Sequence, residues 1–289
     1  MKPMRTLFLS IAHSLSCVLS CVVFGHVRLC REPSPVSPGN SGMQRIYDRL
    51  GVSRRARRKL LAMSSSESPS LAKAGSLMKV LVLCDDRWHP ARTPRAGLAP
   101  LAANGVEFDF VEDVSGWQPA QMDAYPVVLL TKSDNVSAAD WSPWVTPEVE
   151  AAFAAFVRRG GGLLVVHSGT VCRDAPALRA LIGGAFDQHP KQCPVTVEPR
   201  PGHALSAGAA AFTEVDEHYF MHLDAADADV FLTSVSEHGT QPAGWTRQEG
   251  AGRVCVLTPG HNVPVWLHPD FQTLLRNALV WCAQPAPAA

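Results

Sequence analysis

The stretch GGGLLVVHSGT, residues 160–170, decides how the rest of the chain is interpreted. A glycine turn precedes the short apolar run 163–166, which is typical of a β-strand buried on both faces, as in a parallel sheet. His167, Ser168 and Gly169 follow the strand directly. Because ligands of open parallel sheets bind beyond the carboxyl ends of the strands, His167 is the first candidate for a functional residue.

The composition limits the size of the domain and the kind of partner. The chain has 289 residues, 46% hydrophobic and 18% charged, enough apolar material for one large domain or two small ones. Residues 1–77 hold twelve Lys or Arg and three Asp or Glu, whereas residues 78–289 hold fourteen and twenty-three. The second part is acidic, which argues against nucleic acid as a partner, because phosphate binding needs a basic face.

Residues 1–77 differ in character from the rest. The segment 6–25, TLFLSIAHSLSCVLSCVVFG, follows two basic residues in the order of a secretory signal or membrane anchor, although polar residues dilute it. Residues 31–77 are basic and rich in Pro and Ser, so we expect a disordered leader. Three interpretations stay open: translated sequence upstream of a natural start at Met78, a genuine signal or anchor, or a basic regulatory arm. Export, or a membrane as partner, follows only from the second.

Cysteine usage bears on the compartment. Five of the eight cysteines lie beyond residue 78, an odd number without a CxxC pair, and two of them stand inside apolar runs. We interpret them as buried thiols, which favours the reducing cytoplasm if the leader is not a genuine signal: Cys84, Cys172, Cys193, Cys255 and Cys282.

From residue 78 onward, strand and helix patterns alternate. Amphipathic helices are predicted at 94–105 and 146–161, the latter with Thr146 as N-cap and Pro147 in the first turn. Apolar or alternating runs predict strands at 79–84, 106–113, 125–132 and 163–167. This order predicts a doubly wound, mostly parallel α/β sheet with helices on both faces, that is, three layers.

Beyond residue 190, turns rather than helices separate the short apolar segments, and a helix at 269–283 ends the domain. With no repeat or linker visible, we expect a single domain over residues 78–284, followed by a disordered tail at 285–289. The predicted strands form an antiparallel extension of the same sheet and lie at 193–199, 229–236, 243–250 and 252–260.

Histidines, carboxylates and tryptophans gather beyond the predicted strand ends. Exposed aromatic faces stack well on the C–H faces of sugars, and the Trp-rich, Pro-rich segment 137–148 suits the rim or lid of a site. The residues that we expect to bind substrate are Asp85, His89, Ser168, His189 and Trp266.

Four motifs carry a resemblance to a known family. They are FVRRGGGLLVVHSG at 156–169, IGGAFDQHP at 182–190, GHALSAGAAAFTEVDEHYF at 202–220 and GRVCVLTPGHNVPVWLHPDFQTLLRNALVWCA at 252–283. In order and spacing the chain resembles the trehalose-utilisation (ThuA-like) family over roughly residues 78–284. The resemblance implies a flavodoxin-like domain, similar to class I glutamine amidotransferases. It further implies carbohydrate catabolism, with action on keto-sugar derivatives of disaccharides such as trehalose, after an oxidoreductase partner.

The amidotransferase comparison excludes glutaminase chemistry. Those enzymes place a cysteine nucleophile at the sharp turn after the strand, as Cys-x-Gly. Here the triplet is His167-Ser168-Gly169, and histidine forms no thioester. Ser168 is no nucleophile either, because Val166 and Thr170 stand where a G-x-S-x-G elbow needs glycine.

A histidine at this turn can exchange protons near neutral pH or, when neutral, bind a metal. If His261 and Glu217 converge on His167, the three form either a metal-free acid–base site or a site for a divalent metal such as zinc. Asp216 and Glu217 are adjacent and would point to opposite faces of a strand. Glu217 is taken as the inward one because it matches the DE-x-Y pattern of the family.

Three classes of function stay open. The first is a hydrolase or isomerase acting on sugars through His167, Glu217 and His261. The second is a domain of the same fold that binds a sugar or metabolite without catalysis, and the third is an interaction module. The sequence leaves open whether the protein is a homo-oligomer and which sugar it takes.

Overall fold

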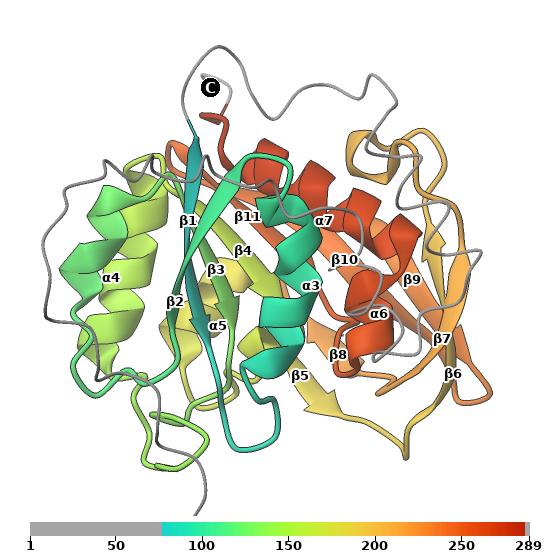
Figure 1. Cartoon of the computed structure of the whole chain (residues 1–289), viewed down its shortest axis with the longest axis horizontal. Helices are drawn as coiled ribbons and strands as arrows, with labels where there is room; N and C mark the ends of the chain where they lie inside the picture. The colour runs from blue at the N-terminus through green and yellow to red at the C-terminus, as the bar shows by residue number, and fades with distance from the viewer. Residues whose placement is uncertain (1–76, 287–289) are drawn as a thin grey trace, which may run out of the picture. The chain divides into compact units, whose positions relative to one another are not determined.

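The computed structural model describes residues 77–286 (Figure 1). Residues 1–76, for which we expect a leader that is a signal, an anchor or an arm, lie outside this range. So do residues 287–289 of the expected tail. Within it, no helix has the length and apolar character needed to cross a membrane.

Nine strands form one sheet in the order β2-β1-β3-β4-β11-β10-β9-β6-β7, and β5 and β8 form a second, two-stranded sheet. The strands are β1 (Met78–Cys84), β2 (Val106–Val111), β3 (Val127–Thr131), β4 (Gly162–Val166), β5 (Gly184–Gln188), β6 (Cys193–Pro199), β7 (Phe212–Asp216), β8 (Phe220–Leu223), β9 (Asp229–Ser236), β10 (Gly239–Glu249) and β11 (Gly252–Leu257).

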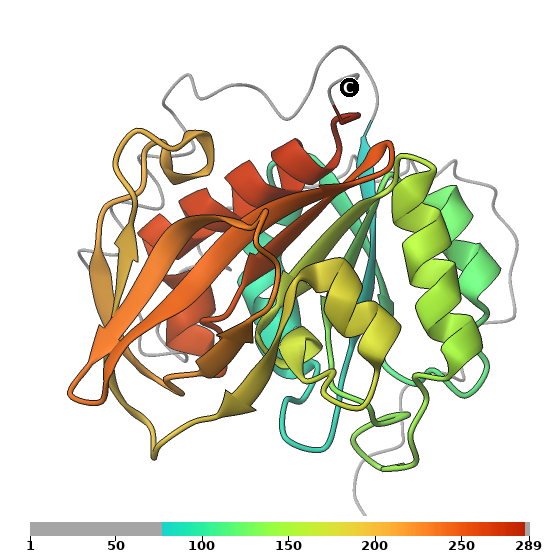
Figure 2. The ribbon, with the colours of Figure 1, turned by 180° about the vertical axis from the view of Figure 1, so that it is seen from behind.

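Helices cover both faces of the large sheet, as predicted (Figures 1 and 2). One face carries α3, α6 and α7, and the opposite face carries α4 and α5. The helices are α3 (Arg92–Ala102), α4 (Pro147–Arg158), α5 (Pro176–Ile182), α6 (Val263–Leu267) and α7 (Pro269–Cys282), with short 3₁₀ turns η1 (Pro119–Ala124), η2 (His167–Thr170) and η3 (Ala204–Ser206).

Local sequence explains why α4 begins where it does. The Thr146 side chain accepts a hydrogen bond from the N–H of Val149, and Pro147 occupies the first turn, as predicted. Glu150, buried in that first turn, accepts a hydrogen bond of 2.8 Å from the backbone N–H of Leu178. This bond ties α4 to α5 on the same face of the sheet.

The structure corrects one part of the predicted topology. The segment 252–260 was expected in the antiparallel extension, but β11 pairs in parallel with β4 and antiparallel with β10. It therefore joins the parallel half of the sheet to the antiparallel half. Five short elements were not predicted: α5, α6, β5, β7 and β8.

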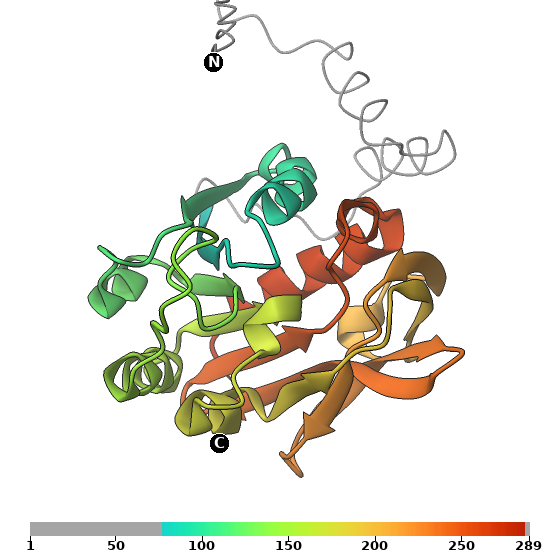
Figure 3. The same cartoon turned by 90° about the horizontal axis from the view of Figure 1, so that it is seen from below.

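The interior is apolar on both sides of the sheet. The central strands β1, β3, β4 and β11 are buried along nearly their whole length, as their continuous apolar runs predict. The five cysteines of this region are free thiols and buried, as predicted from the sequence. In the view of Figure 3, the segments that follow β1, β4 and β11 lie close to one another. The candidate site described below is built from residues of these segments.

Candidate metal centre

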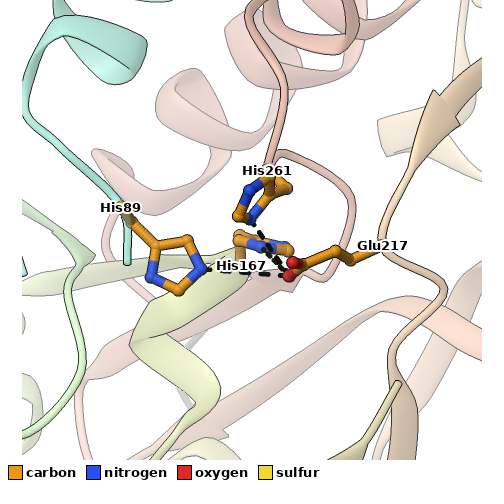
Figure 4. A group of neighbouring side chains, drawn as sticks. All are labelled: His89, His167, Glu217 and His261. Carbon is orange, nitrogen blue, oxygen red and sulfur yellow. Dashed lines mark ion pairs between the residues drawn. The ribbon is translucent and has the colours of Figure 1, made fainter. Parts of the chain in front are cut away.

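Four side chains from distant parts of the chain converge at this edge of the sheet (Figure 4). His89 follows β1, His167 begins η2 directly after β4, Glu217 follows β7, and His261 follows β11. One potential ligand atom of each lies within 4.8 Å of those of the other three. The Oε2 atom of Glu217 lies 3.0 Å from Nδ1 of His261, 3.4 Å from Nε2 of His167 and 4.0 Å from Nε2 of His89. The structure thus brings together the three residues predicted to be catalytic and adds His89.

His89 is oriented by a buried carboxylate. Its Nδ1 lies 2.8 Å from Oδ1 and 3.0 Å from Oδ2 of Asp86, so Nδ1 donates to Asp86 and Nε2 faces the other three residues. Burial acts to raise the pKa of Asp86, but the hydrogen bond and charge of His89, together with backbone N–H donors, outweigh it and hold that pKa at about 2. Burial likewise acts to lower the pKa of His89, but Asp86 and Glu217 raise it to about 9. A cation at the centre would replace the proton on Nε2.

His167 is held in a strained backbone conformation, with φ of 48°. Its Nδ1 lies 2.8 Å from the carbonyl oxygen of Thr258, which only accepts, so Nδ1 carries the proton. Burial lowers the pKa of His167 to about 4, so the ring is neutral at pH 7 and its Nε2 presents a lone pair. The Tyr219 ring stacks on this imidazole at 4.0 Å between centroids and fixes its plane.

One contact in the site places an acceptor against another acceptor. The lone pair of His167 Nε2 faces the Oε2 atom of Glu217 at 3.4 Å. Burial acts to raise the pKa of Glu217, but its contacts with the histidines hold it well below the usual range, so the group is a carboxylate. Among the described residues, His167 Nε2 and His261 Nδ1 are buried, and their contacts with Glu217 Oε2 at 3.4 Å and 3.0 Å lack the geometry of a hydrogen bond. Such orphaned atoms cost free energy unless a cation accepts their lone pairs.

Asp216 and Glu217 point in different directions, as their adjacency predicts. The Asp216 carboxylate accepts hydrogen bonds from three backbone N–H groups, those of Gly260 at 2.8 Å, His261 at 3.0 Å and Asn262 at 3.2 Å. Burial raises the pKa of Asp216 to about 6. Asp216 therefore fixes the loop that carries His261, while Glu217 faces the histidines.

The donor set suits a divalent first-row metal ion. Imidazole nitrogens and a carboxylate oxygen are ligands of Zn²⁺ and of similar ions. Metal-binding histidines usually donate their second ring N–H to a carboxylate or a backbone carbonyl, which is how Asp86 holds His89 and Thr258 holds His167. The four side chains therefore fit a metal ion in two respects: their donor atoms are of the right kind, and two of the imidazoles are held by hydrogen bonds from their second ring nitrogen.

His189 lies at the open side of this cluster. Its Nδ1 donates to the carbonyl oxygen of Pro190 at 2.7 Å, and its Nε2 lies 3.6 Å from the second carboxylate oxygen of Glu217. The side chain is about one-third exposed. It is thus placed beside the centre, where a ligand would reach it.

Three of the residues expected to bind substrate have other surroundings. Both oxygens of Asp85 accept backbone N–H groups, from Ala91 and Ala138 at 2.9 Å each. Ser168 is buried, and its hydroxyl has no partner among the described residues. The expectation that Trp266 offers an exposed face is wrong: the ring is 0% exposed, and its Nε1 donates to the carbonyl oxygen of Gly260. Trp266 supports the His261 loop from within the core.

The other histidines of the domain do not reach the cluster. His218 is buried against Ser234 and Ser236, His203 pairs with Asp229, and His222 lies near Asp187. The sequence reasoning missed Asp86, Thr258 and the ligand position of His89. The spacing Asp-x-x-His directly after the first strand was a usable signal, because it places both residues at the same edge as His167.

The fold and the site together define a class: a doubly wound α/β protein with three histidines and one glutamate gathered beyond its strand ends. The sequence profile of the ThuA family, described as trehalose utilisation, matches residues 79–282. The chain belongs to this family. No curated protein matches the chain.

Solved structures support the fold. A ThuA-like protein of Parabacteroides merdae is 18% identical with a TM-score of 0.58, over 72% of this chain and 91% of its own. A ThuA-like protein of Bacteroides uniformis is 19% identical with a TM-score of 0.57, over 74% of this chain and 95% of its own. A β-galactosidase from Rahnella sp. R3 is 17% identical with a TM-score of 0.51, over 69% of this chain but 31% of its own. At these identities the likeness concerns the fold alone.

Proposed function

We propose that this ThuA-family protein is a divalent-metal-dependent enzyme of carbohydrate catabolism, acting as a hydrolase or isomerase on keto-sugar derivatives of disaccharides such as trehalose. The observation that supports a metal ion is that His167 Nε2, which is buried, and Glu217 Oε2, which is partly exposed, face each other at 3.4 Å, with His89 and His261 beside them. The substrate class rests on membership of the trehalose utilisation family.

The residues of the chain take distinct roles in this proposal. His89, His167, Glu217 and His261 hold the ion, Asp86 and the Thr258 carbonyl orient two of the imidazoles, and His189 binds the substrate. A bound divalent ion supplies Lewis acidity toward a ketone oxygen or a water molecule. Burial of His167 and Tyr219 keeps water from one side of the site, while the partial exposure of the other histidines leaves the opposite side accessible.

Metal binding is the first experiment. The full-length protein is stripped with chelator and titrated with Zn²⁺, Mn²⁺ and Co²⁺ by calorimetry, and bound metal is measured by mass spectrometry. We expect about one ion per chain in the wild type and loss of tight binding in His167→Ala and Glu217→Ala, since each removes a ligand. His238→Ala, whose exposed ring contacts only Glu237 among the described ion-pair partners, serves as the control and should bind as the wild type does.

Turnover is the second experiment. The metal-loaded protein is incubated with 3-keto-trehalose and related keto-glycosides, and products are separated by chromatography. We expect conversion that chelation or His167→Ala abolishes. Conversion that survives chelation would favour metal-free acid–base chemistry, and saturable binding without conversion would favour a sugar-binding domain without catalysis.

A further inference from the structure

Two exposed tryptophans flank an arginine in the segment that leads to His89 of the candidate metal centre. The residues Trp88 and Trp141 are 63% and 54% exposed. The guanidinium carbon of Arg87 lies 4.4 Å from the centroid of Trp88 and 3.5 Å from that of Trp141. Trp88 directly precedes His89, so its Cα lies about 3.8 Å from the Cα of that residue. We call these three residues the Trp–Arg platform.

The loops that carry the platform are tied to the site by hydrogen bonds. Asp86, which orients the His89 ring, also accepts the backbone N–H of Trp88 at 2.8 Å. The neighbouring Asp85 binds the backbone N–H of Ala138, and the carbonyl oxygen of Ala138 accepts the indole N–H of Trp141 at 3.1 Å. Both tryptophans are therefore ordered before any ligand arrives, which lowers the entropic cost of binding to them.

The platform has hydrogen-bond donors and exposed aromatic surface that are not used by other residues in the described part of the chain. Within residues 77–286, no ion pair or hydrogen bond to a neighbouring group is found for the Arg87 guanidinium, whose contacts are the two indole rings. An arginine carries five N–H donors. Large apolar side chains with more than half of their surface exposed are few in this range: Leu77, Trp88, Trp141 and Val215. Two of these four contact one guanidinium, that of Arg87, two residues before His89.

We propose that the Trp–Arg platform is the subsite for the second sugar ring of a disaccharide whose keto ring lies at the metal centre. An indole face matches the C–H face of a pyranose, and guanidinium N–H groups match its hydroxyl oxygens. The ligand class is a neutral hexopyranose in glycosidic linkage. The proposal rests on the proposed function for the position of the keto ring, and it adds the residues that select a disaccharide over a monosaccharide.

The test compares two sugars on four variants of the metal-loaded full-length protein. Trp88→Ala, Trp141→Ala and Arg87→Gln are assayed with 3-keto-trehalose and with 3-keto-glucose, and binding of both sugars and of trehalose is measured by calorimetry. Arg95→Gln is the matched control, because that guanidinium also lies over an aromatic ring, Phe110 at 4.2 Å, but contacts neither Trp88 nor Trp141.

We expect each platform variant to weaken disaccharide binding about tenfold or more, which corresponds to about 1.4 kcal/mol, mainly as a higher KM. Affinity for the monosaccharide should stay within about twofold, and Arg95→Gln should resemble the wild type on both sugars. Zinc content is measured for every variant and should be unchanged, since no platform side chain is a ligand.

The outcomes separate this proposal from the proposed function. Disaccharide affinity that is unchanged in Trp88→Ala and Trp141→Ala, equal losses on both sugars, or no sugar binding by the wild type would each overturn the subsite. Weaker disaccharide binding in these variants, together with turnover that survives both chelation and His167→Ala, would leave the subsite standing and reject the metal-dependent function.

Discussion

Asp86 fixes the orientation of His89: Nδ1 of the imidazole lies 2.8 Å from Oδ1 of the buried carboxylate, which leaves Nε2 facing Glu217. The same carboxylate accepts the backbone N–H of Ser133 from the neighbouring strand end, so β1 and β3 jointly position the histidine. The hydrogen bonds that orient His89 thus come from the ends of two parallel strands at the same edge of the sheet.

The first prediction concerns this support. Asp86→Asn keeps the size of the side chain but removes its charge and one acceptor, so His89 is oriented less firmly and is a weaker ligand. We expect zinc affinity to fall about 10- to 100-fold, measured by competition with a chelator. Asp134→Asn is the control, because Asp134 also follows a parallel strand but binds the backbone N–H groups of Trp144 and Val145. Equal losses in both variants would reject a specific role for Asp86.

The second prediction concerns the loop that carries His261. Asp216→Asn leaves one oxygen acceptor for three backbone N–H groups, those of Gly260, His261 and Asn262. We expect the free energy of unfolding to fall by about 1–3 kcal/mol in urea denaturation, because buried donors lose their partner. Zinc affinity should also fall, since His261 moves with the loop.

The control for that change is Glu214→Gln on the same strand, β7, which should alter neither quantity by more than about 0.5 kcal/mol. If Asp216→Asn lowers stability but leaves zinc affinity unchanged, the loop does not need this carboxylate to position His261.

The position of His167 could be predicted from the sequence, because a buried parallel strand brings the residue that follows it to the binding edge. The alternation of side chains along an extended segment separates Asp216 from Glu217. His89 was placed at the same edge, but as a contact to substrate, because nothing in the spacing shows that its ring turns toward Glu217. The support from the Thr258 carbonyl could not be predicted, since every residue carries such an oxygen.

The place of β11 shows a similar limit. Its apolar run predicts a buried strand, and the turn before it predicts a hairpin with β10, which the structure confirms. The other edge of β11 pairs with β4. This pairing depends on the order of strands in the folded sheet, which local sequence patterns do not predict. Because β11 ends beside β4, His261 lies close to His167. The site therefore depends on this long-range pairing.

The third prediction concerns the packing beneath the site. A Cβ added to Gly97 in α3 would lie 2.5 Å from the Cβ of Trp266 and 2.6 Å from its ring. Gly97→Ala should therefore destabilise the fold by about 1–3 kcal/mol through overpacking, measured by urea denaturation. Gly116→Ala, where an added Cβ meets nothing within 4 Å, should leave stability nearly unchanged or slightly higher. A neutral Gly97→Ala would contradict the tight contact between α3 and α6.

The fourth prediction concerns Lys132, which is buried at the end of β3 and donates to the carbonyl oxygen of Val136 at 2.8 Å. Burial lowers the pKa of this lysine from 10.5 to about 8. Between pH 8 and 10.5 the unfolded chain binds the proton and the folded protein does not. The contribution of Lys132 to the free energy of unfolding therefore rises with pH across this window, by about 3 kcal/mol in all.

The matched test compares the unfolding free energy of Lys132→Met with that of the wild type by urea denaturation at several pH values. The variant lacks the cost of a buried charge, so its advantage over the wild type should be greatest at pH 7 and shrink as pH rises through 8 to 10.5. Taking the difference removes the opposite trend from Cys84 and Cys172, whose thiol pKa values are raised to about 12 by burial. Lys79→Met, at a side chain that is about half exposed, should show no such dependence. A difference between Lys132→Met and wild type that stays constant with pH would mean that Lys132 keeps an ordinary pKa in the fold.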